Sequence, residues 1–435
     1  MPLRLDIRTR QFAERFAQVV AGRREPAANV EKVVAGVVDD VRQRGDAALI
    51  KYTRKFDKVE LTPDRLRFSA REIDLAIADC DKNVVDALEM AARRIGSFHR
   101  RQLPQDLDYT DDVGIRLGYR WTPVSAAGLY VPGGTAAYPS SALMNALPAK
   151  IAGVERLVMV VPTPEGRVNP LVLAAARIAG VDEVYRIGGA QAIAALAYGT
   201  ATIRPVDKIV GPGNAYVAAA KRRVFGIVGI DSIAGPSEVL IVADGSADAD
   251  WIAVDLLAQA EHDAAAQSIL ITDDAAYADA VCAAVDRHLP TLPRRDIARR
   301  SWEDHGVVII VEDLKADAPA LIDRLAPEHL QLALEDPAEF ADSVRHAGAV
   351  FLGRLVPEAL GDYVAGPNHV LPTDRTARFS SGLGVIDFMK RTTFMGCGAG
   401  GLAAIGPAAV TLAEAEGLDA HARSVALRLN RRRTG

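Results

Sequence analysis

Apolar positions recur at helical spacing in the first hundred residues and change to short continuous runs beyond about residue 118. The stretches 29–54 and 69–101 have this helical spacing and few Gly or Pro residues, so both are predicted to be helical. Ser69 followed by Glu72 is a capping-box pattern and marks the start of the second stretch. Residues 1–117 are therefore expected to form an N-terminal helical segment that packs on the rest of the protein.

From about Gly118 the pattern predicts strands that alternate with helices. Residues 157–161 are a continuous, largely β-branched apolar run, which is typical of a strand buried on both faces. Further strands are predicted at 184–187 and 208–210, with helices at 170–179, 190–198 and 214–225. Such alternation indicates a parallel sheet covered by helices, and we place this first α/β lobe at residues 118–233.

A second series of the same kind follows, and we place it at residues 234–385. Its strands are expected at 238–242, 268–271, 307–311 and 350–352, and its helices at 251–265 and 275–288. Two consecutive α/β/α lobes with largely parallel sheets are the simplest account of the two series. Residues 386–435 are predicted to be a small C-terminal helical domain.

The string at 396–401 matches the pattern G-x-G-x-x-G. It does not follow a buried strand, so the structural context of a dinucleotide fingerprint is missing. We interpret it as a flexible connector before the C-terminal helices.

Length, charge and cysteine content narrow the class of protein. A chain of 435 residues is too long for one hydrophobic core, and a formal net charge of -5 provides no field that attracts nucleic acid or an anionic membrane. The cysteines, Cys80, Cys282 and Cys397, are far apart, which suits a reducing compartment. The N-terminus lacks the apolar core of a signal peptide, and no apolar run reaches membrane-spanning length. We expect a cytoplasmic, multidomain protein.

Three glycine-containing loops lie at junctions of the first lobe, at 130–134, 188–191 and 211–214. In open α/β sheets, ligands bind beyond the carboxyl ends of the strands. Glycine there lets backbone amides approach a phosphate, and a helix N-terminus favours its negative charge. Several such loops in one lobe suggest a nucleotide, although each loop alone is also explained as a tight turn between a strand and a helix.

The helix predicted from Trp251 carries a polar residue on its apolar stripe. Gln259 shares this stripe with Ile252 and Leu256, and His262 follows about one turn later, so the two polar side chains can converge on one point. A carboxamide oxygen and an imidazole nitrogen at one point suit a metal ion. An ordinary core helix with a hydrogen-bonded Gln and a solvated His explains the same spacing.

Three further short stretches each combine an acidic residue with a histidine: Glu328 with His329, Asp362 with His369, and Glu416 with His421. The first pair lies where a helix is expected to give way to a strand, and it suits acid–base chemistry. The second pair lies in a loop rich in Gly and Pro. Each pair taken alone is also explained by solvated loop or helix residues.

Taken together, these stretches resemble the histidinol dehydrogenase family. The resemblance covers residues 31–425 and rests on the motifs at 234–238, 259–262, 326–330, 361–369 and 416–421, together with the three glycine loops, all in family order. Only about the first twenty residues and the basic end at 428–433 carry no signature. The resemblance implies aldehyde dehydrogenase-like lobes in a homodimer. It also implies oxidation of L-histidinol through L-histidinaldehyde to L-histidine, with NAD and one Zn²⁺ per subunit.

The resemblance also assigns residues to roles. Zinc would be held by Gln259, His262, Asp362 and His421. The substrate would contact Ser237, Gln259, His262, Glu328, His329, Asp362, His369, Glu416 and His421. NAD would contact Tyr130, Gln191 and Asn214. His329 is the expected base for the alcohol proton, and Glu328 is the expected base for the water that adds to the aldehyde. The C-terminal helices would be exchanged, so that Glu416 and His421 complete the partner's site.

Two other classes of function stay open at this stage. In a zinc hydrolase, the metal itself would activate water and the first lobe would bind no nucleotide. A nucleic-acid-binding protein is suggested only by the basic residues at 428–433, and the net negative charge of the chain argues against it.

Overall fold

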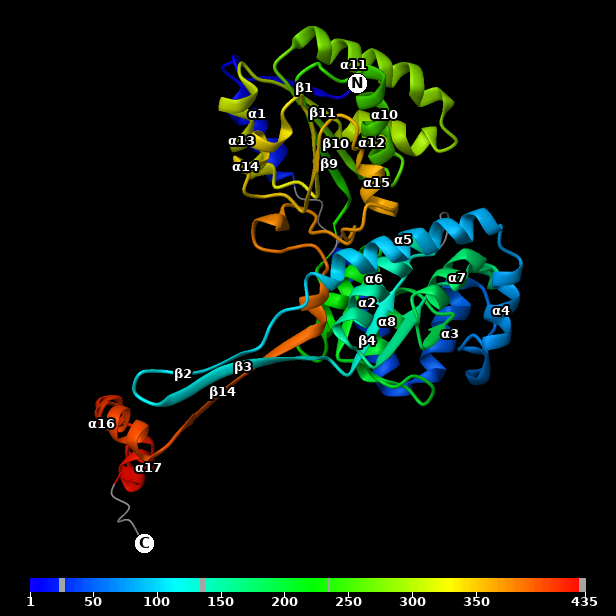
Figure 1. Cartoon of the computed structure of the whole chain (residues 1–435). Helices are drawn as coiled ribbons and strands as arrows, with labels where there is room; N and C mark the ends of the chain where they lie inside the picture. Colours follow the sequence, from blue (N-terminus) through cyan, green and yellow to red (C-terminus); the bar gives the residue numbers. More distant parts are fainter. Residues whose placement is uncertain (23–27, 134–137, 234, 430–435) are drawn as a thin grey trace. The chain divides into compact units, whose positions relative to one another are not determined.

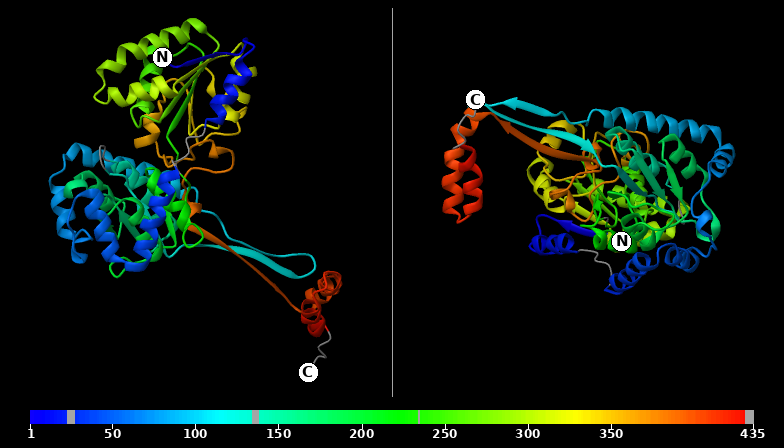
Figure 2. Two further views of the ribbon diagram at one scale, coloured as in Figure 1. Left: turned by 180° about the vertical axis from the view of Figure 1, so that it is seen from behind. Right: turned by 90° about the horizontal axis from the view of Figure 1, so that it is seen from below.

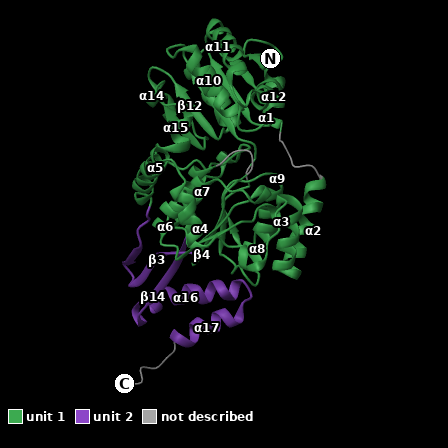
Figure 3. Ribbon diagram, turned by 90° about the vertical axis from the view of Figure 1, so that its right-hand side faces the viewer, with its two compact units in different colours: residues 1–102, 125–388 green, residues 103–124, 389–435 purple. Residues whose placement is uncertain are grey.

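The computed structural model describes residues 1–22, 28–133, 138–233 and 235–429. The chain divides into two compact units, coloured separately in Figure 3. Unit 1 comprises Met1–Gln102 and Ser125–Phe388, and unit 2 comprises Leu103–Val124 and Met389–Gly435. Gly134, Ala234 and the basic residues at 431–433, which entered the sequence motifs, lie outside the described residues.

The first sheet of unit 1 is parallel throughout and has the order β6-β5-β4-β7-β8. Its strands are β4 (Ala126–Tyr130), β5 (Arg156–Val160), β6 (Glu183–Tyr185), β7 (Lys208–Val210) and β8 (Gly229–Ile230). The order runs outwards from β4 in one direction and from β7 in the other. The topological switch point therefore lies between β4 and β7, which is where doubly wound sheets bind ligands.

Helices cover this sheet, as Figure 1 shows, and the core is built from apolar side chains of both layers. The helices of the lobe are α6 (Pro139–Ala152), α7 (Pro170–Ile178), α8 (Gly189–Tyr198) and α9 (Ala215–Val224). They are joined from the N-terminal part by α2 (Ala28–Arg44), α3 (Asp46–Asp57), α4 (Ala70–Ala78) and α5 (Lys82–Arg100). The capping box that starts α4 is confirmed, because Ser69 Oγ accepts the Glu72 N–H at 3.2 Å and Glu72 Oε2 accepts the Ser69 N–H at 2.8 Å.

The second sheet of unit 1 is also parallel and has the order β1-β11-β10-β9-β12-β13. Its strands are β1 (Leu3–Asp6), β9 (Glu238–Ala243), β10 (Gln267–Thr272), β11 (Val307–Ile310), β12 (His329–Ala333) and β13 (Ala349–Leu352). Side chains of α10 (Ala249–Ala260), α11 (Ala275–His288) and α12 (Arg295–His305) form a core with one face. Those of α1 (Phe12–Ala21), α13 (Leu314–Leu325) and α14 (Pro337–Asp342) form a core with the other.

Unit 2 is an antiparallel ribbon with a pair of helices. Strands β2 (Leu107–Thr110), β3 (Ile115–Pro123) and β14 (Met389–Cys397) have the order β14-β3-β2, and α16 (Ala399–Ala415) and α17 (Asp419–Leu429) follow. Both views in Figure 2 show β3 and β14 side by side along their length, in the register that pairs Met389 with Pro123 and Cys397 with Ile115. Gly118 is required there, because a Cβ atom would lie 2.2 Å from the Leu107 carbonyl oxygen.

The prediction of two α/β/α lobes with largely parallel sheets is confirmed, and four local predictions were wrong. The Gly/Pro loop expected at 361–369 begins inside helix α15 (Glu358–Tyr363), which contains Asp362. Residues 1–117 are not helical throughout, since they contain β1, β2 and the start of β3. The glycine connector at 396–401 is instead the end of β14 and the first turn of α16. The helix expected to reach residue 265 ends at Ala260. The lobe boundaries drawn from the sequence remain predictions.

The remaining elements are short. Helix α15 spans Glu358–Tyr363, and single 3₁₀ turns lie at Pro63–Arg65, Pro164–Gly166, Leu289–Thr291, Thr376–Arg378 and Val385–Phe388. Among the described residues, no helix combines the length and the apolar character needed to cross a bilayer.

Candidate active site

The proposed acid–base pair lies at the amino ends of two neighbouring strands of the second sheet. Strand β9 begins at Glu238 and β12 at His329, and the strands are paired in parallel, with His329 opposite Val239. Parallel strands begin at the same edge, so the residues that precede them meet there. The Glu238 N–H donates to Glu328 Oε2 at 2.9 Å, and the Ser237 hydroxyl also hydrogen-bonds the Glu328 carboxyl group.

The hydrogen bonding of His329 fixes its tautomer. Its Nδ1 lies 3.0 Å from the Glu238 carbonyl oxygen, which can only accept, so Nδ1 carries the proton. Nε2 then has a free lone pair, and it is buried without a hydrogen-bond partner in the described part of the chain. Burial lowers the pKa of His329, which keeps the ring neutral. The arrangement suits a base that takes up a proton at Nε2.

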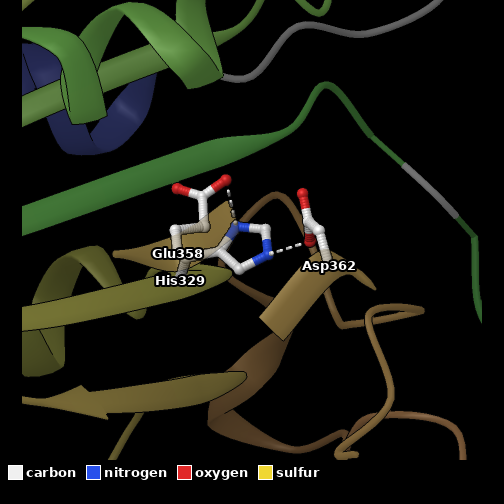
Figure 4. A group of neighbouring side chains, drawn as sticks. All are labelled: His329, Glu358 and Asp362. Carbon is white, nitrogen blue, oxygen red and sulfur yellow. Dashed lines mark ion pairs between the residues drawn. The ribbon is translucent and has the colours of Figure 1, made fainter. Parts of the chain in front are cut away.

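Two carboxylates flank the His329 ring, as Figure 4 shows. Asp362 Oδ1 lies 3.8 Å from Nε2, and Glu358 Oε1 lies 3.8 Å from Nδ1. Both acids belong to α15, four residues apart, so they lie on one face of this helix. One ligand atom from each of His329, Glu358 and Asp362 lies within 4.8 Å of the others, close enough to hold a cation.

Burial governs the charge state of the two glutamates. Loss of solvation raises the pKa of Glu328 well above its usual value, and the negative charges of Glu238 and Asp362 add to this rise. Burial also raises the pKa of Glu358, with further contributions from Asp362 and Glu328. A cation beside Asp362 would lower both pKa values, so the acidic cluster and a positive charge favour each other.

Glu358 was missed by the sequence analysis. Its signal is the spacing of four residues from Asp362 on a short helix, which places two carboxylates on one face. The motifs used were centred on histidines, and Glu358 has none beside it.

Gln259 and His262 present unused ligand atoms. Gln259 lies in the last turn of α10 and is only 1 % exposed, and neither atom of its amide has a hydrogen-bond partner among the described residues. His262 lies just beyond the helix, and its Nδ1 donates to the Ala258 carbonyl oxygen at 3.0 Å, which leaves the Nε2 lone pair for a ligand. A buried amide without partners costs about 1–3 kcal/mol, which a bound cation would offset.

His369 is held between α15 and α6. Its Nδ1 donates to the Asp362 carbonyl oxygen at 2.9 Å, and its Nε2 lies 3.2 Å from Ser141 Oγ on α6. The neighbouring Asn368 amide donates to the Met144 carbonyl oxygen, also on α6, at 2.7 Å. The loop after α15 is thus tied to α6 by side chains. Burial lowers the pKa of His369, and the charge of the nearby His262 lowers it further.

The remaining two predicted site residues belong to unit 2. Glu416 follows the last residue of α16, and His421 lies in the first turn of α17; both are exposed. Unit 1 thus brings together Ser237, Glu328, His329, Asp362 and His369, with His262 near enough to affect the pKa of both other histidines. Glu416 and His421 belong to the other unit, and their part in this site stays a prediction.

The three residues expected to contact NAD lie at the carboxyl ends of strands of the first sheet or at the start of the helices that follow. Tyr130 is the last residue of β4, Gln191 lies in the first turn of α8, and Asn214 caps α9 by accepting the Tyr216 and Val217 N–H groups at 3.1 and 3.2 Å. The Tyr130 hydroxyl accepts the Gly189 N–H at 3.1 Å. The glycine loops that follow β4 and β7 therefore adjoin the switch point, where a ligand is expected.

Asp57 adds a pH-dependent feature to this lobe. It is the last residue of α3, and burial raises its pKa to about 6. A hydrogen bond from the Thr163 N–H partly opposes this rise. Because the pKa of Asp57 is higher in the folded protein than in the unfolded chain, its protonated form favours folding. This contribution to stability is complete below about pH 3.8 and is lost as the pH rises through about 6. At pH 8 the chain holds a buried carboxylate whose Oδ2 has no partner among the described residues.

We therefore expect Asp57→Asn to stabilise the protein at pH 8 and to stabilise it about half as much near pH 5, because the penalty of the raised pKa grows between about pH 3.8 and 6. The amide oxygen can still accept the Thr163 N–H, while the cost of the buried charge, about 1 kcal/mol after allowance for partial solvation, disappears. Urea unfolding midpoints of variant and wild type at both pH values measure the difference. Equal midpoints at pH 8 would contradict the expectation.

A doubly wound lobe with glycine loops at its switch point and a second α/β lobe with a buried, neutral imidazole fit the class of α/β oxidoreductases that use a dinucleotide. The chain belongs to the histidinol dehydrogenase family, whose model matches residues 21–429. It is an NAD-dependent oxidoreductase that oxidises histidinol in histidine biosynthesis, as the motifs predicted. The hydrolase and nucleic-acid-binding alternatives are not the chemistry of this family.

Individual relatives agree over the full length of the chain. It is 68% identical to histidinol dehydrogenase from Rhodospirillum rubrum over 431 residues, which cover 99% of both chains. It is 62% identical to that from Rhodopseudomonas palustris, with 99% of this chain and 100% of the relative covered. The crystal structure of histidinol dehydrogenase from Elizabethkingia anophelis superposes with a TM-score of 0.93 at 37% identity and 98% coverage of each chain.

Proposed function

We propose that both oxidation steps take place beside His329, with histidinaldehyde kept in the site between them. The observation that carries this proposal is the fixed tautomer of His329, whose unpartnered Nε2 lies 3.8 Å from Asp362 Oδ1, while its Nδ1 lies 3.8 Å from Oε2 of the buried Glu328. In the first step, Nε2 takes the alcohol proton while a hydride leaves the carbinol carbon for NAD. The products of this step are the aldehyde, NADH and one proton.

The second step needs water, and Glu328 is the proposed base. It removes a proton from water as the water oxygen adds to the aldehyde carbon, while the carbonyl oxygen takes up the proton that His329 holds from the first step, which gives the hydrate. His329 then takes a hydroxyl proton of the hydrate while a second hydride leaves for a second NAD. This gives the carboxylic acid, which loses its proton to solvent and becomes the carboxylate. The fixed position of Glu328, held by the Glu238 N–H and the Ser237 hydroxyl, supports this role.

Zinc is the proposed cation, held by Gln259, His262, Asp362 and His421. The donor set of two imidazoles, one carboxylate and one amide oxygen suits Zn²⁺, and the orphaned amide of Gln259 fits a ligand atom. When bound, zinc would chelate the substrate imidazole and amine and so fix the carbinol carbon in place. Asp362 is assigned to zinc and His329 is not, because His329 Nε2 is needed as the base.

The NAD site is proposed at Tyr130, Gln191 and Asn214, and the remaining substrate contacts at Ser237, His369 and Glu416. We further propose a cytoplasmic homodimer with shared active sites, which binds neither nucleic acid nor membrane. Exposed apolar side chains on the helices of unit 2 and on the turn between them support association: Leu412 is 65 % exposed, Leu418 42 % and Leu427 71 %.

The test is the yield of NADH per histidinol consumed, together with metal analysis of the purified protein. We expect two NADH per histidinol and one zinc per subunit. A yield of one NADH, with free aldehyde in solution, would refute the two-step proposal.

A cysteine thiohemiacetal is the rival route for the second step, and the thiols of this chain do not suit it. Burial raises the pKa of Cys80 and of Cys282, which disfavours the thiolate, and Cys397 is exposed at the end of β14 in unit 2.

We therefore expect a variant with all three cysteines replaced by alanine to oxidise histidinal within about twofold of the wild-type rate, because no thiolate is needed. Single-turnover NADH formation from bound histidinal measures this rate. Loss of the reaction with histidinal still bound would exclude the proposed water route.

A further inference from the structure

An ion pair between Lys221 and Asp231 is buried in the first lobe. Their side chains are only 2 % and 5 % exposed, and Lys221 Nζ contacts Asp231 Oδ1 directly. A fully buried lysine is rare in proteins, and a buried ion pair is often no more stabilising than apolar residues of the same size. The function assigned so far uses neither residue, so the pair needs a separate explanation.

Both partners of the pair hold the same residue, Gly211. Lys221 Nζ donates to the Gly211 carbonyl oxygen at 3.0 Å, and the Gly211 N–H donates to Asp231 Oδ2 at 2.8 Å. Gly211 has a φ of +112°, and a Cβ atom there would lie 2.1 Å from the Tyr130 carbonyl oxygen. The ion pair thus clamps both the N–H and the carbonyl group of a position that only glycine can occupy.

The clamped residue controls the loops at the switch point. Gly211 follows β7 directly and starts the loop that ends at Asn214, the N-cap of α9. The backbone of Tyr130 lies against Gly211, while the Tyr130 hydroxyl accepts the N–H of Gly189 at the start of α8. A shift of Gly211 would therefore move the loops after β4 and β7 relative to each other and to α8.

We propose that Lys221 and Asp231 are positioning residues for NAD, which hold the Gly211 loop in the conformation that the dinucleotide binds. This inference rests on the proposed NAD site at Tyr130, Gln191 and Asn214. Apolar residues could fill the same space but could not bond both polar groups of Gly211, which explains an ion pair at this place. Neither residue is proposed to contact the substrate or zinc.

The decisive variant is the neutral pair Lys221→Met with Asp231→Asn. It leaves no unpaired buried charge, keeps an oxygen for the Gly211 N–H and removes the donor to the Gly211 carbonyl oxygen. Lys221→Leu with Asp231→Asn also leaves no buried charge and removes the same donor, so it gives the same comparison if the first neutral pair does not fold. Arg223→Met is the matched control, since Arg223 forms an exposed ion pair with Asp39 from the same helix, α9, at 3.1 Å.

Equilibrium binding of NADH to the zinc-loaded full chain, followed by fluorescence, is the main readout. We expect the neutral pair to bind NADH about tenfold more weakly, the loss of roughly one hydrogen bond, with unchanged affinity for histidinol. Arg223→Met should bind both ligands as wild type does. A folded neutral pair with wild-type NADH affinity would overturn the proposal, and so would equal weakening of both ligands, which indicates general damage to the fold.

Hydrogen exchange separates this inference from the NAD site on which it rests. In wild type, NADH should protect the amides of residues 211–217 from exchange, and in the neutral pair these amides should exchange faster before NADH is added. No protection in wild type would refute the NAD site itself. Protection in wild type, with equal exchange in the ligand-free neutral pair, would refute the clamp alone.

Discussion

The Glu328→Gln variant is expected to convert histidinol to the aldehyde at a rate near that of wild type but to oxidise histidinal about a hundredfold more slowly. General-base catalysis contributes about 10²–10⁴-fold, and only the aldehyde step needs water to lose a proton. The glutamine oxygen can still accept the Glu238 N–H that holds Glu328 Oε2 at 2.9 Å. The change therefore removes the base and keeps the local hydrogen bond.

Rapid mixing of enzyme and NAD with histidinol or with histidinal measures the two steps separately. Glu358→Gln is the matched control, because Glu358 is as buried as Glu328 and lies 3.8 Å from the same His329 nitrogen but is not assigned to water. It should not slow one step selectively. If Glu328→Gln slowed both steps equally, Glu328 would act by positioning His329 and not by activating water.

Mixing Asp362→Ala with His421→Ala is expected to restore activity that neither variant has alone. Each variant lacks one proposed zinc ligand, Asp362 from unit 1 or His421 from unit 2. If His421 completes the partner's site, a hybrid dimer contains one intact set of ligands. Random pairing after joint unfolding and refolding makes half of the dimers hybrid, so activity should return to roughly a quarter of wild type.

The matched control mixes Asp362→Ala with Gln259→Ala. Both changes lie in unit 1, so every site of the hybrid lacks a ligand and no activity should return. NADH formation and bound zinc are measured on the same samples. Absence of recovery in the first mixture, with dimers present, would mean that each chain completes its own site.

The alternation of strands and helices was predictable because parallel strands buried on both faces are continuous apolar runs. Strand β5 and the cap Ser69 lie where the sequence indicated. The junction at Glu328 and His329 was also predicted, because the strand signal begins directly after it. Its position at the amino edge of the sheet depends on the pairing of β9 with β12, which no local pattern reveals.

The elements that escaped prediction lack a local signal for a physical reason. Strand β3 is half-buried along most of its length and β14 is exposed along most of its length, so no alternation of buried and exposed positions marks either strand. The end of α10 at Ala260 has neither Gly nor Pro nearby. Glu358 is a site residue only because α15 turns its carboxylate towards His329, a contact between distant parts of the chain.

The first strand of the chain has a consequence for synthesis on the ribosome. Strand β1 pairs only with β11 in the described sheet, and Leu3 lies opposite Val307, so the start of the chain must wait for its neighbour. At about 5–20 residues per second, this wait lasts about 15–60 s. Throughout it, Phe12 and Phe16, which are buried in the finished lobe, lack the surface that covers them. The nascent chain thus carries an unpaired strand and an amphipathic helix with an uncovered apolar face until β11 has emerged, and transiently exposed apolar surface of this kind favours aggregation.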